Sequence, residues 1–136
     1  MDNKKGFTLV EMLAVITLLI IVMAVALPNI ISSINRNKES QWNTTLELIY
    51  SAVDIYVDDI SSNIPELKIP GSKIKVPIRY LMEKDLLKEN LTDPRDDSMI
   101  DIYSEVLITV DDNKIKRYSY PAKCSSEECI TIEAPR

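Results

Sequence analysis

The sequence contains no histidine among its 136 residues. Histidine is the usual general base near neutral pH, and it completes the Ser-His-Asp triad, the Cys-His dyad and most zinc sites. Its absence removes all of these forms of catalysis and metal binding together. We therefore predict a protein that is not an enzyme and that holds neither a metal nor an organic cofactor.

Cysteine is nearly as scarce, with two residues in the whole chain. Cys124 and Cys129 are separated by four residues in a segment of Ser and Glu, and two thiols without histidine cannot complete a zinc site. If this part of the chain is extracellular, we expect a disulfide between them, whose small ring would stabilise the fold by roughly 2 kcal/mol. Free thiols are the alternative.

Positive charge is missing from a long part of the chain, because the next cation after Lys4 and Lys5 is Arg36. Cations that gather before an apolar segment place that side in the cytoplasm, so we expect the rest of the chain outside. The formal net charge is −5, which argues against nucleic-acid binding by bulk electrostatics. A local basic strip at residues 114–117 is the segment that could still contact nucleic acid.

After these lysines comes an apolar run from Phe7 to Leu27 that carries a single charge, Glu11. As a helix that rises about 1.5 Å per residue, the run spans roughly 31 Å, the hydrocarbon thickness of a bilayer. An unpaired carboxylate inside a membrane costs on the order of 3 kcal/mol, so Glu11 needs a partner. Cleavage after Gly6 would supply one, because the new amine of Phe7 lies one helical turn away, in the same chain or in a staggered neighbour.

Two simpler interpretations of this run compete. Ala24, Val25 and Ala26 look like the small-residue cleavage site of a secretory signal peptide that begins with basic residues. The run could also be a plain single-pass membrane anchor. Both interpretations leave Glu11 without a purpose, and the first predicts a mature chain that begins after Ala26.

Four features of the N-terminal segment together carry a family resemblance. A short charged leader ends in Gly6, Phe7 follows it, Glu11 is the fifth residue of the remaining chain, and Pro28 follows the apolar run. This pattern resembles type IV prepilins and type II secretion pseudopilins. The resemblance is close over residues 1–28 and looser to about Ile60.

The resemblance implies how the protein would mature. In that family a membrane peptidase cuts after the glycine, here Gly6, on the cytoplasmic side and N-methylates the new first residue, here Phe7. The subunits then assemble through the N-terminal helix. On this basis we expect a leader peptide at residues 1–6, a transmembrane and filament-core helix at 7–28, and an extracellular pilin-like head at 29–136.

Pattern and propensity predict the remainder of the helix. Pro28 should kink it, because proline lacks the N–H that would bond to the carbonyl of Ala24. Farther on, apolar residues recur at three- and four-residue steps, and Pro65 should end the helix near Asn63. This second apolar stripe comprises Trp42, Leu46, Ile49, Val53, Tyr56, Val57 and Ile60. Another element must cover it.

The segments after the helix are predicted to form the elements that cover this apolar stripe. Residues 65–77 indicate a loop with a short extended piece at 73–76, and Pro77 can begin a short helix. That helix would place Ile78, Leu81, Met82 and Leu86 on one face. Residues 102–110, 115–120 and 129–133 predict strands. We therefore expect an α+β, pilin-like fold in which the long helix, membrane-spanning in its first half and amphipathic in its second, packs on a small antiparallel β-sheet.

The loop from Asp93 to Asp101 gathers the oxygen ligands that calcium takes. Some of the pseudopilins that the chain resembles bind calcium in a loop before their last strands. The spacing here fits no calcium-loop signature, so we predict no metal in this loop.

The resulting hypothesis is a structural subunit of an extracellular filament like a type IV pilus. It would lie in the cytoplasmic membrane with its N-terminus inside before assembly, and at the cell surface afterwards. The expected partners are copies of itself, other pilins and the prepilin peptidase and methyltransferase, with nucleic acid only if the filament serves DNA uptake. The alternatives are a minor pilin or pseudopilin of a secretion or competence system, and a monomeric membrane-anchored binding head.

Overall fold

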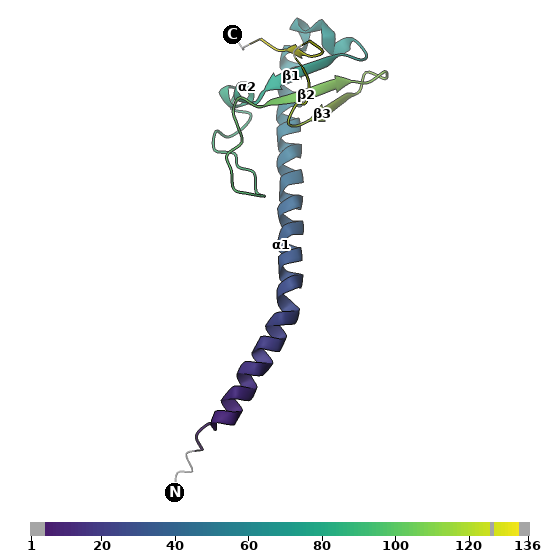
Figure 1. Cartoon of the computed structure of the whole chain (residues 1–136). Coiled ribbons are helices and arrows are strands. Elements are labelled where there is room, and N and C mark those ends of the chain that lie inside the picture. The colour runs from purple at the N-terminus through teal and green to yellow at the C-terminus, as the bar shows by residue number, and fades with distance from the viewer. Residues whose placement is uncertain (1–4, 126, 134–136) are drawn as a thin grey trace. The chain divides into compact units, whose positions relative to one another are not determined.

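The fold is that of a computed structural model, which describes residues 5–125 and 127–133. The chain forms two compact units, Met1–Lys38 and Glu39–Arg136, and one long helix, α1 (Leu9–Ile60), contributes to both (Figure 1). Each unit is considered by itself. Of the leader predicted at residues 1–6, Lys5 and Gly6 are described, whereas Lys4 and the residues before it lie outside the described part.

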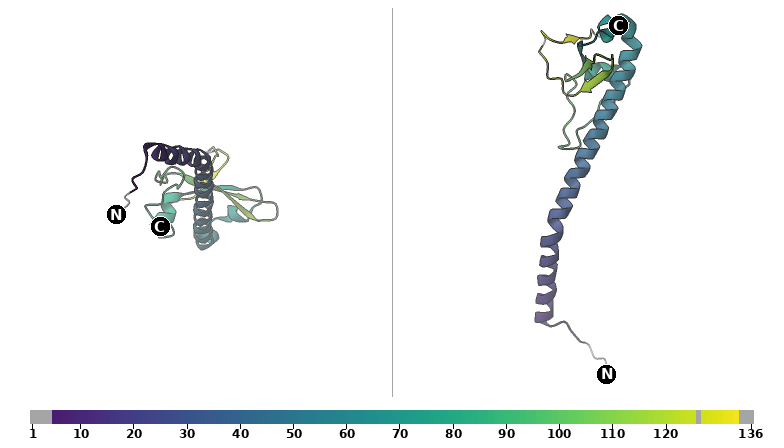
Figure 2. Two further views of the ribbon diagram at one scale, coloured as in Figure 1. Left: turned by 90° about the horizontal axis from the view of Figure 1, so that it is seen from below. Right: turned by 90° about the vertical axis from the view of Figure 1, so that its right-hand side faces the viewer.

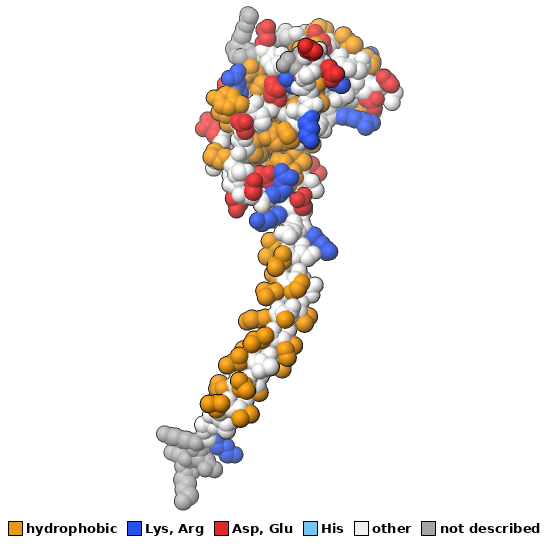
Figure 3. Space-filling model, in the orientation of Figure 1, with side chains coloured by type: hydrophobic (Ala, Val, Ile, Leu, Met, Phe, Trp, Pro, Cys, Tyr) orange, Lys and Arg blue, Asp and Glu red, His pale blue; other side chains and the backbone are white. Residues whose placement is uncertain are grey.

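The first unit is an apolar helix that nothing covers. No side chain of α1 before Trp42 is buried, and hydrophobic side chains follow one another along the whole visible face of its first half (Figure 3). In length and hydropathy, the helical stretch Leu9–Asn63 is the one described segment that could cross a membrane. These properties agree with the membrane-length run predicted from the sequence.

Pro28 lies inside α1, and the helix continues through it. Because proline has no N–H, the Ala24 carbonyl lacks its usual partner four residues on. One residue later the side-chain amide of Asn29 donates to the Val25 carbonyl at 3.5 Å. The predicted kink at Pro28 itself stays a prediction.

The second unit is built on a four-stranded sheet, whose strands are β1 (Lys73–Pro77), β2 (Glu105–Val110), β3 (Lys116–Ser119) and β4 (Ile130–Thr131). Their order is β3-β2-β1-β4. β1 pairs antiparallel with β2, as in Ile74 opposite Ile108, and β2 pairs antiparallel with β3. The pair β1 and β4 is parallel.

The sheet is therefore mixed, and the expectation of a purely antiparallel sheet was wrong for its last strand. Between β3 and β4 the chain passes from one edge of the sheet to the other, and it then runs beside β1 in the same direction. Short hairpins join antiparallel strands, whereas this return needs a longer connection, which residues 120–129 provide. The short extended piece expected at 73–76 is confirmed as β1, although its place in the interior of the sheet was not predicted.

Short helical turns connect α1 to the sheet. α1 is followed by the 3-10 turn η1 (Ser61–Asn63), and Ile64, directly before Pro65, leaves helical geometry. A second 3-10 turn, η2 (Pro65–Lys68), comes next. The short helix α2 (Ile78–Glu83) begins directly after Pro77, as predicted. Three of the four residues expected on its apolar face, Ile78, Leu81 and Met82, are buried.

The core of this unit lies between the second half of α1 and the sheet. Figure 2 shows the sheet on one side of this part of the helix. The buried residues of α1 are Trp42, Ile49, Ala52, Val53, Tyr56 and Val57, and they meet Ile74, Val76, Val106 and Ile108 of the sheet in one cluster. Each fully buried aliphatic side chain contributes roughly 1.5 to 3 kcal/mol of transfer free energy. The predicted stripe and its cover are confirmed, and with them the α+β, pilin-like arrangement.

Candidate functional site

The predicted processing site lies in a short exposed segment before α1. Residues 5–8 have no regular secondary structure, and Phe7 keeps 74% of its surface exposed. A Cβ atom on Gly6 would meet no atom within 4 Å, and the residue does not adopt the left-handed backbone geometry that favours glycine. Within one chain, neither packing nor backbone conformation therefore demands a glycine at this position.

Thr8 determines where α1 begins. Its side-chain oxygen Oγ1 accepts a hydrogen bond from the Glu11 backbone N–H at 3.2 Å, and its carbonyl accepts one from the Met12 N–H at 3.1 Å. This is N-cap geometry, in which a hydroxyl satisfies one of the donors that the first turn leaves without a helical partner. The spacing Thr8-x-x-Glu11 is that of a capping box, a signal that reasoning about the charge of Glu11 alone had missed.

The carboxylate of Glu11 lies in the first turn of α1 and is exposed. Among the residues that the structure describes, no lysine or arginine forms an ion pair with it. The start of a helix is a favourable place for a negative charge because of the helix dipole, but that effect is worth 1 kcal/mol or less at an exposed position. A stronger partner must come from a new terminal amine or from another molecule.

The helix that carries Glu11 exposes apolar side chains on every face. Between Phe7 and Ile34, all the large hydrophobic residues keep at least 45% of their surface exposed. A helix that is hydrophobic all around is stable only when lipid or other protein surrounds it. This surface can thus serve both as a membrane segment and as a contact between chains.

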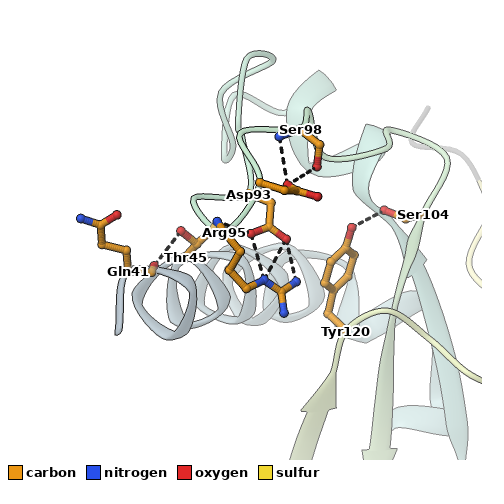
Figure 4. Close-up of polar contacts among 8 residues, drawn as sticks. Gln41, Thr45, Asp93, Arg95, Ser98, Ser104 and Tyr120 are labelled. Carbon is orange, nitrogen blue, oxygen red and sulfur yellow. Dashed lines mark hydrogen bonds and ion pairs between the residues drawn. The ribbon is translucent and has the colours of Figure 1, made fainter. Parts of the chain in front are cut away.

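In the acidic loop that follows α2, residues 93–101, carboxylates accept hydrogen bonds from neighbouring residues of the same loop (Figure 4). Asp93 holds Arg95, with 2.6 Å between Oδ2 and Nη2, and the Arg95 guanidinium lies 4.1 Å from the centre of the Trp42 ring. Asp96 accepts hydrogen bonds from the backbone and hydroxyl of Ser98. The Arg95 hydrogen bond lowers the pKa of Asp93, and the Ser98 hydrogen bonds lower that of Asp96.

These contacts give the acidic loop a structural role. The Asp93–Arg95 pair stacks the loop on α1 through Trp42, whose ring also lies 6.2 Å from that of Tyr120. Over the described residues, no group of three or more acidic or cysteine side chains is arranged to hold a metal ion. The Asp-rich composition is explained by turns that cap themselves.

The basic strip at residues 114–117 is largely neutralised by carboxylates. The Lys116 ammonium lies 2.8 Å from Asp58 Oδ1 and 3.4 Å from Asp54 Oδ1, while Arg117 pairs with Asp111 at 3.2 Å. Burial works to lower the pKa of Lys116, but the two carboxylates outweigh it and the pKa is raised. Lys116 thus joins β3 to α1, which leaves little positive charge for a nucleic-acid backbone.

The two cysteines lie at disulfide distance in the connection between β3 and β4. The Cα atoms of Cys124 and Cys129 are 6.2 Å apart, within the usual range for a bridge. Cys129 is buried and immediately precedes β4. A bridge here would hold the chain on its path from one edge of the sheet to the other.

Comparisons with known proteins bear on the N-terminal segment. A family described as the prokaryotic N-terminal methylation motif matches residues 1–27. The type IV major pilin protein PilA of Myxococcus xanthus (strain DK1622) is 40% identical over 50 residues, which are 37% of this chain and 23% of that protein. In this segment the chain is type IV pilin-like.

This likeness is concentrated at the N-terminus. The pilin-like chain matches less than a quarter of the length of the PilA relative, and no solved structure matches it. The methylation motif and the apolar helix fit membrane anchoring followed by assembly into a pilus.

Proposed function

We propose that this protein is a structural subunit of an extracellular type IV pilus-like filament. A peptidase cuts it after Gly6, Phe7 becomes the N-methylated first residue, and the subunits assemble through α1. The observation that carries the proposal is the exposed apolar helix with Glu11 in its first turn, inside a segment that matches the methylation motif. The exposed position of Gly6, which no packing contact explains, supports a role in recognition by the peptidase.

Glu11 sets the register of assembly in this proposal. The amine of Phe7 in one subunit pairs with the Glu11 carboxylate of another, and the apolar surfaces of residues 7–28 then cover one another. A buried ion pair adds little net stability but excludes alignments that leave a charge unpaired, so it selects one stagger along the helix axis. Leu48 and Ile55 also stay exposed on the head part of α1 and are available for contacts between subunits.

The topology follows from the same proposal. Residues 1–6 are the leader on the cytoplasmic side, residues 7–28 cross the membrane before assembly, and residues 29–136 form the extracellular head. The alternatives, a minor pilin or a pseudopilin of a secretion or DNA-uptake system, share this processing and differ in the abundance of the filament. DNA uptake is the weaker alternative, because Lys116 and Arg117 of the basic strip are paired with carboxylates.

The mature N-terminus tests the proposal directly. Mass spectrometry of the membrane fraction should find a chain that begins with N-methylated Phe7, and the Gly6→Val variant should remain full length in the membrane. Electron microscopy of a sheared surface fraction should then find filaments for the wild type alone. A mature chain that begins after Ala26 would identify a secretory signal peptide and overturn the proposal.

A further inference from the structure

The sheet of the head ends in an open edge. β4 is the outermost strand on one side, opposite β3, and within the described part of the chain no further strand lies beyond it. The Ile132 N–H donates to the Lys75 carbonyl of β1 at 3.1 Å. Because backbone groups alternate in direction along a strand, the N–H and C=O of Thr131 face away from β1. They are placed to pair with another strand.

A groove of about 700 Å³ lies beside this edge, between β4 and the end of α1. Buried Tyr56 and Ile132 form part of its lining, and half-buried Ile60 and Ile64 form another part. Ile130, next to Thr131 on β4, also lines it and keeps 48% of its surface exposed. A volume of this size is within the range of sites that hold ligands or short peptide segments. The edge therefore offers backbone pairing together with apolar contacts.

The rim of the groove is acidic. Asp59, Glu66 and Glu133 contribute three carboxylates, against one ammonium from Lys84, so its formal charge is 1 − 3 = −2. A negative rim repels phosphates, carboxylate ligands and nucleic acid, and it attracts lysine and arginine side chains. The negative rim therefore favours a ligand with basic side chains, and the open edge of β4 favours a peptide segment in an extended conformation.

We propose that the β4 edge and this groove bind an extended, basic segment of a partner protein by strand addition. Backbone hydrogen bonds to Thr131 supply affinity in this mode, and alternate side chains of the added strand supply specificity. One set of alternate side chains would enter the groove against Ile60 and Ile64, and basic residues would meet Asp59 and Glu66. This binding is a property of the head alone and does not depend on cleavage after Gly6.

A binding assay with the full chain in detergent micelles tests the proposal. The probe is a fluorescein-labelled synthetic peptide of ten residues in which Lys and Arg alternate with Val and Thr, and binding is followed by fluorescence anisotropy. We expect saturable binding that weakens several-fold when salt rises from about 50 to about 500 mM, because screening reduces the attraction of exposed charges. A matched peptide with Glu in place of Lys and Arg should bind at least tenfold more weakly.

Two substitutions at Thr131 separate strand addition from nonspecific attraction. Thr131→Pro removes the outward N–H but leaves the pairing with β1 intact, as proline is tolerated on the open side of an edge strand. It should weaken peptide binding at least tenfold, whereas Thr131→Val keeps the N–H and should bind like wild type. Fluorescence of Trp42, the single tryptophan and a core residue, reports whether each variant is folded.

A charge variant keeps the test decisive if Thr131→Pro fails to fold. Glu66→Lys changes the rim from −2 to 0 and should weaken the basic peptide several-fold. Equal binding of the basic and acidic peptides, or equal binding by folded Thr131→Pro and Thr131→Val, would overturn the proposal. Self-association of the chain that Thr131→Pro abolishes would identify a second copy as the occupant and would also overturn it.

Discussion

Replacing Glu11 by glutamine separates the two roles that the structure allows for this residue. Glutamine at the third position of a helix keeps the capacity for a capping box with Thr8, but it removes the charge. Valine at the same position removes both. If the charge selects the register of assembly, Glu11→Gln and Glu11→Val should fail alike, although both should still be cut after Gly6.

The expected size of the defect follows from the missing partner. In the proposed filament, a neutral side chain at position 11 leaves the neighbour's Phe7 amine buried without a counter-charge. An unpaired charge in such an apolar environment costs about 3 kcal/mol. Since about 1.4 kcal/mol corresponds to a factor of ten, entry into filaments should fall roughly 100-fold.

Thr17 provides a matched control inside the same apolar run. Its hydroxyl donates to the Leu13 carbonyl at 2.8 Å, so this polar group is already satisfied within its own helix. Thr17→Val should therefore assemble like wild type. The assay is immunoblotting and electron microscopy of sheared filaments from cells that express each variant alone. If Glu11→Gln forms as many filaments as Thr17→Val, the charge-pairing mechanism is wrong.

Further substitutions test the helix start, the head and the cysteines. Thr8→Ala should slow cleavage several-fold relative to Thr8→Ser, because alanine lets the helix extend toward the cut site; equal rates measured by pulse-chase would exclude this role. Tyr118→Phe removes the hydroxyl that donates to Asp54 and should destabilise the head by about 1 kcal/mol in urea unfolding, whereas Tyr50→Phe keeps the stacked ring pair and should have little effect. The Tyr118 hydrogen bond lowers the pKa of Asp54, so this contribution is present above the unfolded pKa of about 4 and should vanish as the pH falls through the lower folded value. The two cysteines should accept alkylating reagent only after reduction, and full alkylation of the native protein would exclude the disulfide.

The sequence predicts elements whose apolar residues recur at a regular spacing better than elements that depend on residues far away in the chain. The stripe from Trp42 to Ile60 recurs at helical spacing, and most of it is buried. The alternation of lysine with apolar residues at 73–76 predicts the extended geometry of β1, but not its place inside the sheet. Its Lys75 is buried with its ammonium 3.1 Å from Glu105, a partner 30 residues away that no local pattern reveals.

The candidate sites also differ in whether their residues are close together in the sequence. Gly6, Phe7 and Glu11 form a local motif that can be read from the sequence, and Thr8 belongs to the same short stretch. The groove beside β4, by contrast, combines the end of α1 with residues more than 60 positions later. Its parallel strand depends on a crossover whose path is fixed by packing rather than by local propensity, so neither the open edge nor its acidic rim was predictable.

Polar and apolar groups that find no partner within the chain indicate which surfaces of this protein contact other molecules. Among the described side chains, no buried nitrogen or oxygen lacks a hydrogen-bond partner, and the main charge clusters of the head pair internally. Because these groups already have partners, we expect the head to bind another molecule without a large conformational change. Among the described residues, the groups without a partner include the apolar surface of the first unit, the Glu11 carboxylate and the β4 edge. The first two require lipid or another helix, whereas the edge requires a strand, so substitutions in the two regions should impair different functions. A Thr131→Pro chain that still enters filaments, beside a Glu11→Gln chain that still binds the basic peptide, would establish that independence.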